Sequence, residues 1–207
     1  MARSGLALRA IVLVVVALIS GVLLLGCGAS RPAVATAGIP PGLLLQARPI
    51  GRGANFRPPA SGPVIGGCQR RLGPRSGVHV ELFADNRVVI VAAGIGTRPP
   101  RSFALGRISR AACYGSLVTL EPTGLVLVRA GSRALLSDLF RAWGQPLSPR
   151  RLASFSAPAG MPVAVFVNGR RWHGSPGSVP LTAHSEIVLE LGPHVPPHTS
   201  YAFPPGT

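Results

Sequence analysis

Histidine, cysteine and carboxylate side chains are the groups in this chain that could bind a metal ion or transfer a proton. A metal site needs three or four donor atoms that converge in space. His194 and His198 lie on either side of two prolines, which exclude a helix, so we expect two solvated side chains there. The remaining histidines are His79, His173 and His184.

His79 alternates with Val78 and Val80 in a segment of strand composition, so we expect its ring on the face opposite the valines. The simplest interpretation is a surface histidine or an internally hydrogen-bonded one. A divergent metal-binding domain that uses His79, His173 and His184 is the alternative hypothesis. We expect no cofactor.

Catalytic motifs are absent from the sequence. It contains no Gly-x-Ser-x-Gly elbow, no P-loop and no dinucleotide glycine fingerprint. His173 lies close to Ser175, but the Gly/Pro-rich surroundings indicate a loop after a hairpin. Glu186 and Glu190 share a predicted strand, where four residues correspond to about 13 Å. We therefore expect a non-catalytic protein, and an envelope hydrolase is a further alternative.

The N-terminal segment has the plan of a secretory signal. Arg3 and Arg9 precede an apolar run over residues 11–25, and small residues then flank a cysteine. The last four residues of this segment are Leu24-Leu25-Gly26-Cys27, which resemble the lipobox of bacterial lipoproteins.

This resemblance implies that residues 1–26 are removed and that Cys27 is diacylated, which would hold the protein in the bilayer on the extracytoplasmic side of the cell membrane. Two or more acyl chains make such attachment durable. One alternative is an uncleaved transmembrane helix, although the apolar run is shorter than the roughly 20 residues of a typical span. Ordinary secretion with an unmodified Cys27 is the other.

Two cysteines remain once Cys27 carries lipid. Cys68 and Cys113 lie 45 residues apart, and in an oxidising compartment they are expected to form a disulfide. Loop-closure entropy gives such a bond about 3–4 kcal/mol of stabilisation. The alternative is a pair of free buried thiols, and no Cys-x-x-Cys spacing suggests redox activity.

The charge of the chain is strongly positive. All 21 basic residues are arginine, only six residues are acidic, and the formal net charge is +15. Such a surface favours anionic lipid or cell-wall polymer as a partner. No recognition motif accompanies the charge, so nucleic acid is not an expected partner. Biased composition without a specific polyanionic partner is the alternative explanation.

The elements that would position these residues are mostly strands. Three hairpins are predicted, around the turns at 85–87, 122–124 and 168–169, of which Asn168-Gly169 is the strongest signal. A short helix is predicted from Ser132 to Trp143, with Gly144 ending it. The last strand covers residues 187–191.

These elements predict a mainly β (α+β) fold, with two small β-subdomains as one possible arrangement. We expect a signal peptide at 1–26, a flexible Gly/Pro/Arg-rich tether at 27–67, a globular domain at 68–192 and a loose proline-rich tail at 193–207.

The order of short motifs in residues 78–191 resembles an uncharacterised group of exported bacterial domains. No activity follows from this resemblance, and this chain lacks the histidines that the group carries after its Cys-Tyr block. The matching pieces are His79, Leu82-Phe83, Cys113-Tyr114, Trp143-Gly144-Gln145-Pro146-Leu147, Val167-Asn168-Gly169 and His184-Ser185-Glu186-Ile187.

Overall fold

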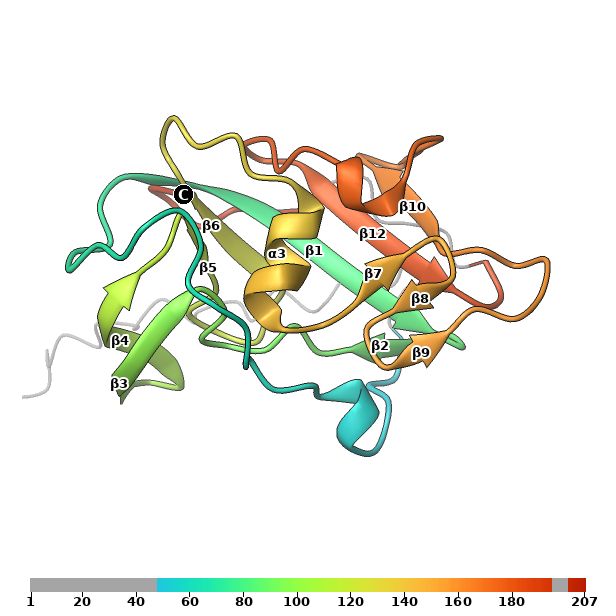
Figure 1. Ribbon diagram of the computed structural model, residues 1–207, viewed down its shortest axis with the longest axis horizontal. Coiled ribbons are helices and arrows are strands. Elements are labelled where there is room, and N and C mark those ends of the chain that lie inside the picture. Colours follow the sequence, from blue (N-terminus) through green and yellow to red (C-terminus); the bar gives the residue numbers. More distant parts are fainter. Residues whose placement is uncertain (1–47, 195–200) are drawn as a thin grey trace, which may run out of the picture. The chain divides into compact units, whose positions relative to one another are not determined.

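The strand β1 (Arg75–Ala84) is the centre of the fold in the computed structural model, which describes residues 48–194 and 201–207. It belongs to a seven-stranded sheet with the order β11-β10-β12-β1-β6-β5, and β2 pairs with the distal part of β1 (Figure 1). The other strands of this sheet are β2 (Arg87–Val89), β5 (Leu117–Val118), β6 (Leu125–Arg129), β10 (Ala164–Val167), β11 (Arg170–Arg171) and β12 (Glu186–Leu191).

The expected mainly β fold is confirmed, and all three predicted hairpins belong to this one sheet rather than to two subdomains. The described residues all fall within one compact unit. The predicted last strand, β12, pairs with β1 in parallel, which places it next to the central strand.

The single described α-helix, α3 (Leu136–Trp143), covers one face of the sheet (Figure 1). Its apolar side chains pack with residues that alternate along β1 and β12, including Leu82 and Leu189. The helix is shorter than predicted because it begins after Leu135, whose N–H donates to the Asp138 carboxylate. It ends at Gly144, which has the left-handed conformation. No helix in the described ranges is long and apolar enough to cross a bilayer.

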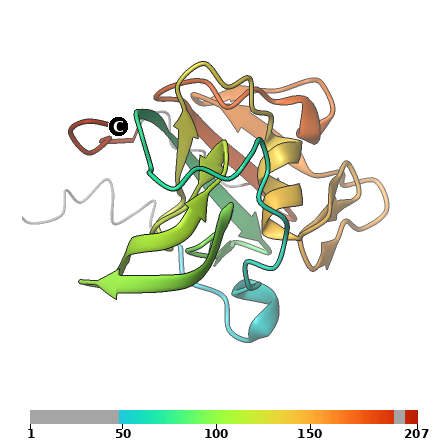
Figure 2. The ribbon, with the colours of Figure 1, turned by 60° about the vertical axis from the view of Figure 1, so that its left-hand side comes forward.

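Two smaller sheets complete the domain. β7 (Leu147–Ser148), β8 (Arg151–Leu152) and β9 (Phe155–Ser156) form one of them. The other is a hairpin of β3 (Thr97–Ala104) and β4 (Arg107–Tyr114), which projects from the rest of the domain in Figure 2. The sequence analysis did not predict this hairpin, whose first strand contains Pro99 and Pro100.

The expected tether boundary at residue 68 needs correction, because residues 48–67 lie on the domain. The 3₁₀ helix η1 (Ala54–Phe56) precedes Pro58, whose carbonyl accepts the indole N–H of Trp143 at 3.1 Å. The ring of Phe56 contacts that of Phe155, with centroids 4.7 Å apart. The signal peptide, Cys27 and the start of the tether lie outside the described residues.

The predicted disulfide between Cys68 and Cys113 is confirmed, with a Cα–Cα distance of 5.3 Å. It joins the segment before β1 to β4. Gln69 and Tyr114 exchange two backbone hydrogen bonds beside it, at 2.8 and 2.9 Å. The disulfide and these two backbone hydrogen bonds therefore fix the segment before β1 to strand β4.

The expected loose tail also differs from the structure, since residues 201–207 lie on the sheet. Phe203 is close to Gly77 of β1, and the ring of Tyr201 stacks on that of His79. A second 3₁₀ helix, η2 (Pro176–Ser178), lies between β11 and β12.

Candidate functional site

The sheet face opposite α3 carries a row of buried polar side chains. The parallel register places His79 beside Glu186 and Phe83 beside Glu190. Glu81 lies between the two positions of β1, and its carboxylate faces His79 and Glu186. Three of the six acidic residues of the chain therefore lie on this face, although the net charge is strongly positive.

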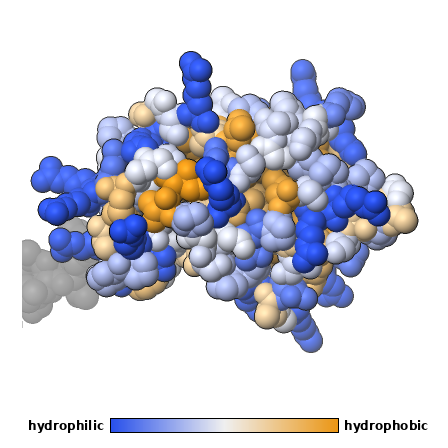
Figure 3. Space-filling model, viewed as in Figure 1, coloured by the Kyte–Doolittle hydropathy of each residue, from blue (hydrophilic) through white to orange (hydrophobic). Residues whose placement is uncertain are grey.

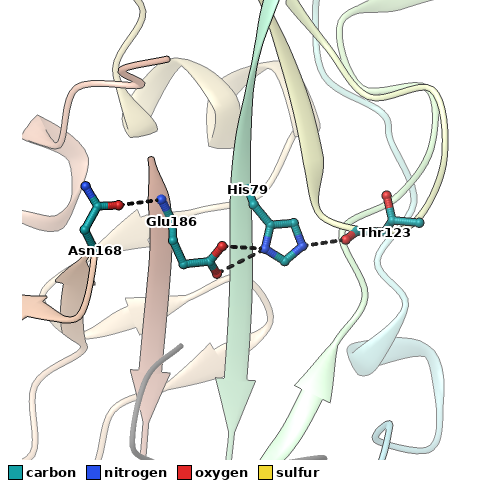
Figure 4. Close-up of polar contacts among 4 residues, drawn as sticks. All are labelled: His79, Thr123, Asn168 and Glu186. Carbon is teal, nitrogen blue, oxygen red and sulfur yellow. Dashed lines mark hydrogen bonds and ion pairs between the residues drawn. The ribbon is translucent and has the colours of Figure 1, made fainter. Parts of the chain in front are cut away.

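His79 and Glu186 form the centre of the site (Figure 4). The Nδ1 atom of His79 lies 2.8 and 3.0 Å from the two carboxylate oxygens of Glu186, and its Nε2 donates to the carbonyl of Thr123 at 2.9 Å. Both side chains are buried. Burial of a charged pair is tolerated when further hydrogen bonds satisfy its polar atoms.

The loop between β5 and β6 delivers the Thr123 carbonyl to this ring. Gly124 has a φ of +83°, and a Cβ there would lie 2.5 Å from the carbonyl oxygen of Val80 and 3.0 Å from Nε2 of His79. Glycine at this position therefore permits the close approach of the loop.

The protonation state of His79 can be inferred from the hydrogen-bond partners of its two ring nitrogens. Both ring nitrogens face atoms that can only accept a hydrogen bond, a carbonyl oxygen and a carboxylate. While Glu186 is ionised, this geometry favours a proton on both nitrogens, so we infer that the ring is an imidazolium below its folded-state pKa. Burial alone lowers the pKa of His79, but the hydrogen bond and charge of Glu186, the Thr123 carbonyl and the charge of Glu81 together raise it above its ordinary value.

Tyr201 covers the imidazolium. Its ring is stacked on that of His79, with centroids 3.8 Å apart and an interplanar angle of 9°. Stacking places the π face of the phenol over a cation, which is an attractive arrangement. Burial, together with the charges of Glu121 and Glu186, raises the pKa of the Tyr201 hydroxyl, so this ring stays neutral.

The turn that follows β10 holds the backbone of Glu186. The side-chain oxygen of Asn168 accepts the N–H of Glu186 at 2.8 Å (Figure 4). The strongest turn signal in the sequence therefore has a second role, because it fixes the start of β12.

Further along β12, Glu190 contacts Nδ1 of His194 through one oxygen, while its other oxygen has no hydrogen-bond partner among the described residues.

One group of side chains in the described ranges has the composition of a metal site. Donor atoms of His79, Glu81 and Glu186 lie within 4.8 Å of one another. The distances between Nδ1 and the Glu186 oxygens are those of a charge-assisted hydrogen bond. The arrangement is thus that of a charged pair with a second carboxylate beside it. An adjoining cavity of about 100 Å³ offers room for water.

The structure does not bring together the three histidines of the metal-binding hypothesis. His173 is exposed in the loop after β11. The ring of His184 instead contacts Phe203 and the Thr207 carbonyl. The predicted face of His79 is correct, but its partners are a carboxylate, a carbonyl and a tyrosine.

Glu186, Thr123 and Tyr201 were missed as site residues by the sequence analysis. A signal for Glu186 was present, because Glu186 and Glu190 are four residues apart on the predicted strand and so lie on one face of it. Nothing local in the sequence links this strand to His79, which is 107 residues away. No family model, curated protein or solved structure matches this chain.

Proposed function

We propose that this protein is an extracytoplasmic lipoprotein of the bacterial type, anchored through acylated Cys27, whose β domain binds another component of the cell envelope without catalysis. The observation that carries the proposal is the pairing of Cys68 with Cys113. Structural disulfides are typical of exported proteins. Since the chain has three cysteines, this pairing leaves Cys27 as the one available for lipid.

The anchor predicts a defined mass for the native protein. We expect membrane-extracted protein to lack residues 1–26 and to carry acyl chains on Cys27, and the Cys27→Ser variant to carry none. Intact-mass spectrometry measures both. Retention of residues 1–26, or a processed chain without lipid mass, would contradict the anchor while leaving the domain's binding properties open to a separate test.

An arginine-lined surface supports the binding part of the proposal. A groove of about 540 Å³ lies beside the disulfide, and Gln69, Arg70, Arg71 and Arg129 line it. Arg129 also donates to the carbonyl of Gly66, which fixes that guanidinium at the wall of the groove. Hydrophilic side chains project widely over the face drawn in Figure 3. A polyanion of the envelope is the partner that this charge favours.

A matched pair of arginine variants tests the groove. Replacing Arg70 and Arg71 with serine should weaken binding of a polyphosphate probe about 10-fold or more at low salt, because two charge-assisted contacts are lost. Replacing Arg150 and Arg151, another exposed pair, should have a smaller effect. Equal losses in a titration calorimetry series would show that only net charge matters and that the groove is not a site.

A further inference from the structure

The tip of the β3–β4 hairpin exposes large apolar side chains. Phe103 is 65% exposed and Leu105 is fully exposed. Ile108, by contrast, is buried, and its N–H donates to the carbonyl of Leu120 at 2.8 Å. β4 is therefore fixed to the domain as far as Ile108, which pairs with Phe103, and only the turn beyond this pair extends away from the domain (Figure 2).

The conformation of Leu105 is unfavourable for leucine. The pairing of Ala104 with Arg107 leaves Leu105-Gly106 as a two-residue turn, with φ values of +50° and +75°. Such turns favour asparagine, aspartate or glycine at both positions. A bulky side chain in the left-handed region is disfavoured.

Two other hairpins of this chain have the same kind of turn and use the favoured residues. Asp85-Asn86 connects β1 to β2 with φ values of +49° and +59°, and Asn168-Gly169 connects β10 to β11 with +50° and +75°. Folding therefore gives no reason for leucine at position 105. Because Leu105 neither packs in the domain nor suits its turn, the leucine points to a role outside the fold.

Arginines flank this apolar tip. Arg107 and Arg110 are exposed on β4 near the turn, and Arg98 is exposed near the start of β3. No acidic residue lies between positions 86 and 120. Arg101 is held at the base, where it donates to the Thr97 side chain and to backbone carbonyls. Apolar side chains flanked by cations along the hairpin match the interface of an anionic bilayer, in which the apolar groups enter the acyl region and the cations stay among the phosphates.

We propose that the β3–β4 hairpin inserts its tip, Phe103 and Leu105, into an anionic phospholipid bilayer while the arginines bind lipid phosphates. The proposal uses the proposed anchor only as the reason that a bilayer is near. Twenty residues, 28–47, separate Cys27 from the first described residue, and a chain of that length spans at most about 70 Å. A tether of this reach raises the local concentration of lipid around the tip.

The test places a fluorescent reporter at the tip. The chain is produced without acylation, so that Cys27 keeps its free thiol, and it is coupled through this thiol to a maleimide lipid in vesicles with brominated acyl chains, which supplies the tether independently of the proposed anchor. Leu105→Trp is compared with Met161→Trp, whose site is also exposed and apolar but lies outside the hairpin. The tryptophan fluorescence of each variant is compared with that of the parent chain under the same conditions.

We expect bromine to quench the emission added by Leu105→Trp in phosphatidylglycerol vesicles, with little quenching in phosphatidylcholine and none for Met161→Trp. Changing Arg98, Arg107 and Arg110 to serine in the Leu105→Trp chain should remove the preference for the anionic lipid. Equal quenching at both sites, or none at position 105, overturns the proposal. A protein surface would then be the better candidate for the partner of the tip.

Leu105→Asn separates folding from membrane contact. Asparagine suits the left-handed position, so the melting temperature should rise by about 2–4 °C. The same change should abolish protection of the hairpin by vesicles in hydrogen exchange. A more stable variant that keeps this protection would also overturn the proposal, because the leucine would then have no function at the bilayer.

Discussion

Replacing His79 with alanine should lower the free energy of unfolding by about 3–5 kcal/mol, the loss typical of breaking a buried ion pair on one side. The change leaves the buried Glu186 carboxylate without its imidazolium partner and the Thr123 carbonyl without its donor. It also removes the ring on which Tyr201 stacks. Urea denaturation followed by tryptophan fluorescence measures the loss, since Trp143 is fully buried.

Two further variants locate the origin of this loss. Glu186→Gln keeps the shape of the side chain and removes its charge, so it should also destabilise the domain strongly. His173→Ala changes an exposed histidine and should stay within about 0.5 kcal/mol of the parent. A loss at His79 no larger than that at His173 would show that the pair does not stabilise the folded domain.

The stabilising effect of His79 should depend on pH. The pKa of this histidine is raised in the folded domain, above the 6.5 of an unperturbed side chain. Its contribution is therefore fully present below about pH 6.5 and is lost as the pH rises through the folded-state pKa. The charged and titratable groups nearest to the ring are Glu186, Glu81 and Tyr201.

The comparison that isolates this dependence is the difference in unfolding free energy between the parent chain and His79→Ala, measured across the pH range with a chelator present. The difference should be largest at mildly acidic pH and should shrink toward alkaline pH. A difference that grows with pH would mean that the folded domain prefers the neutral ring, which contradicts the imidazolium inferred from its two acceptors.

Much of the local structure could be predicted because local chemistry determines it. The turn at Asn168-Gly169 requires positive φ values, and glycine and asparagine are the residues that adopt them most readily. The apolar face of α3 and its end at Gly144 follow from helical periodicity and the left-handed cap. Alternation along β1 correctly placed His79 on the face opposite Val78 and Val80.

The site itself could not be predicted because its parts meet through long-range pairing. β1 and β12 become neighbours by a parallel register between residues about 107 positions apart, and no local pattern encodes that choice. The missed β3–β4 hairpin has a different cause. Its exposed strands are rich in arginine and contain two prolines, so they lack the β-branched composition by which strands are recognised.

Replacing Cys68 and Cys113 with alanine removes the disulfide and should lower the free energy of unfolding by about 3–4 kcal/mol. The bond closes a loop of 45 residues, and its loss restores conformational freedom to the unfolded chain. That loop contains β1, β2 and β3, so the unfolded state gains freedom over the centre of the fold. Urea denaturation under non-reducing conditions measures the difference from the parent.

If the disulfide stabilises the domain by constraining the unfolded chain, several properties of the folded domain should stay unchanged in the alanine variant. Because the effect acts mainly on the unfolded state, the folded variant should keep the backbone bridge between Gln69 and Tyr114 and the protection of β1 from hydrogen exchange. Cys27→Ser should leave the unfolding free energy of the domain as it is, since that cysteine is outside the disulfide. If the alanine variant and the parent had equal stability under non-reducing conditions, the bond would not constrain the unfolded chain, and the inference of export would lose its main support.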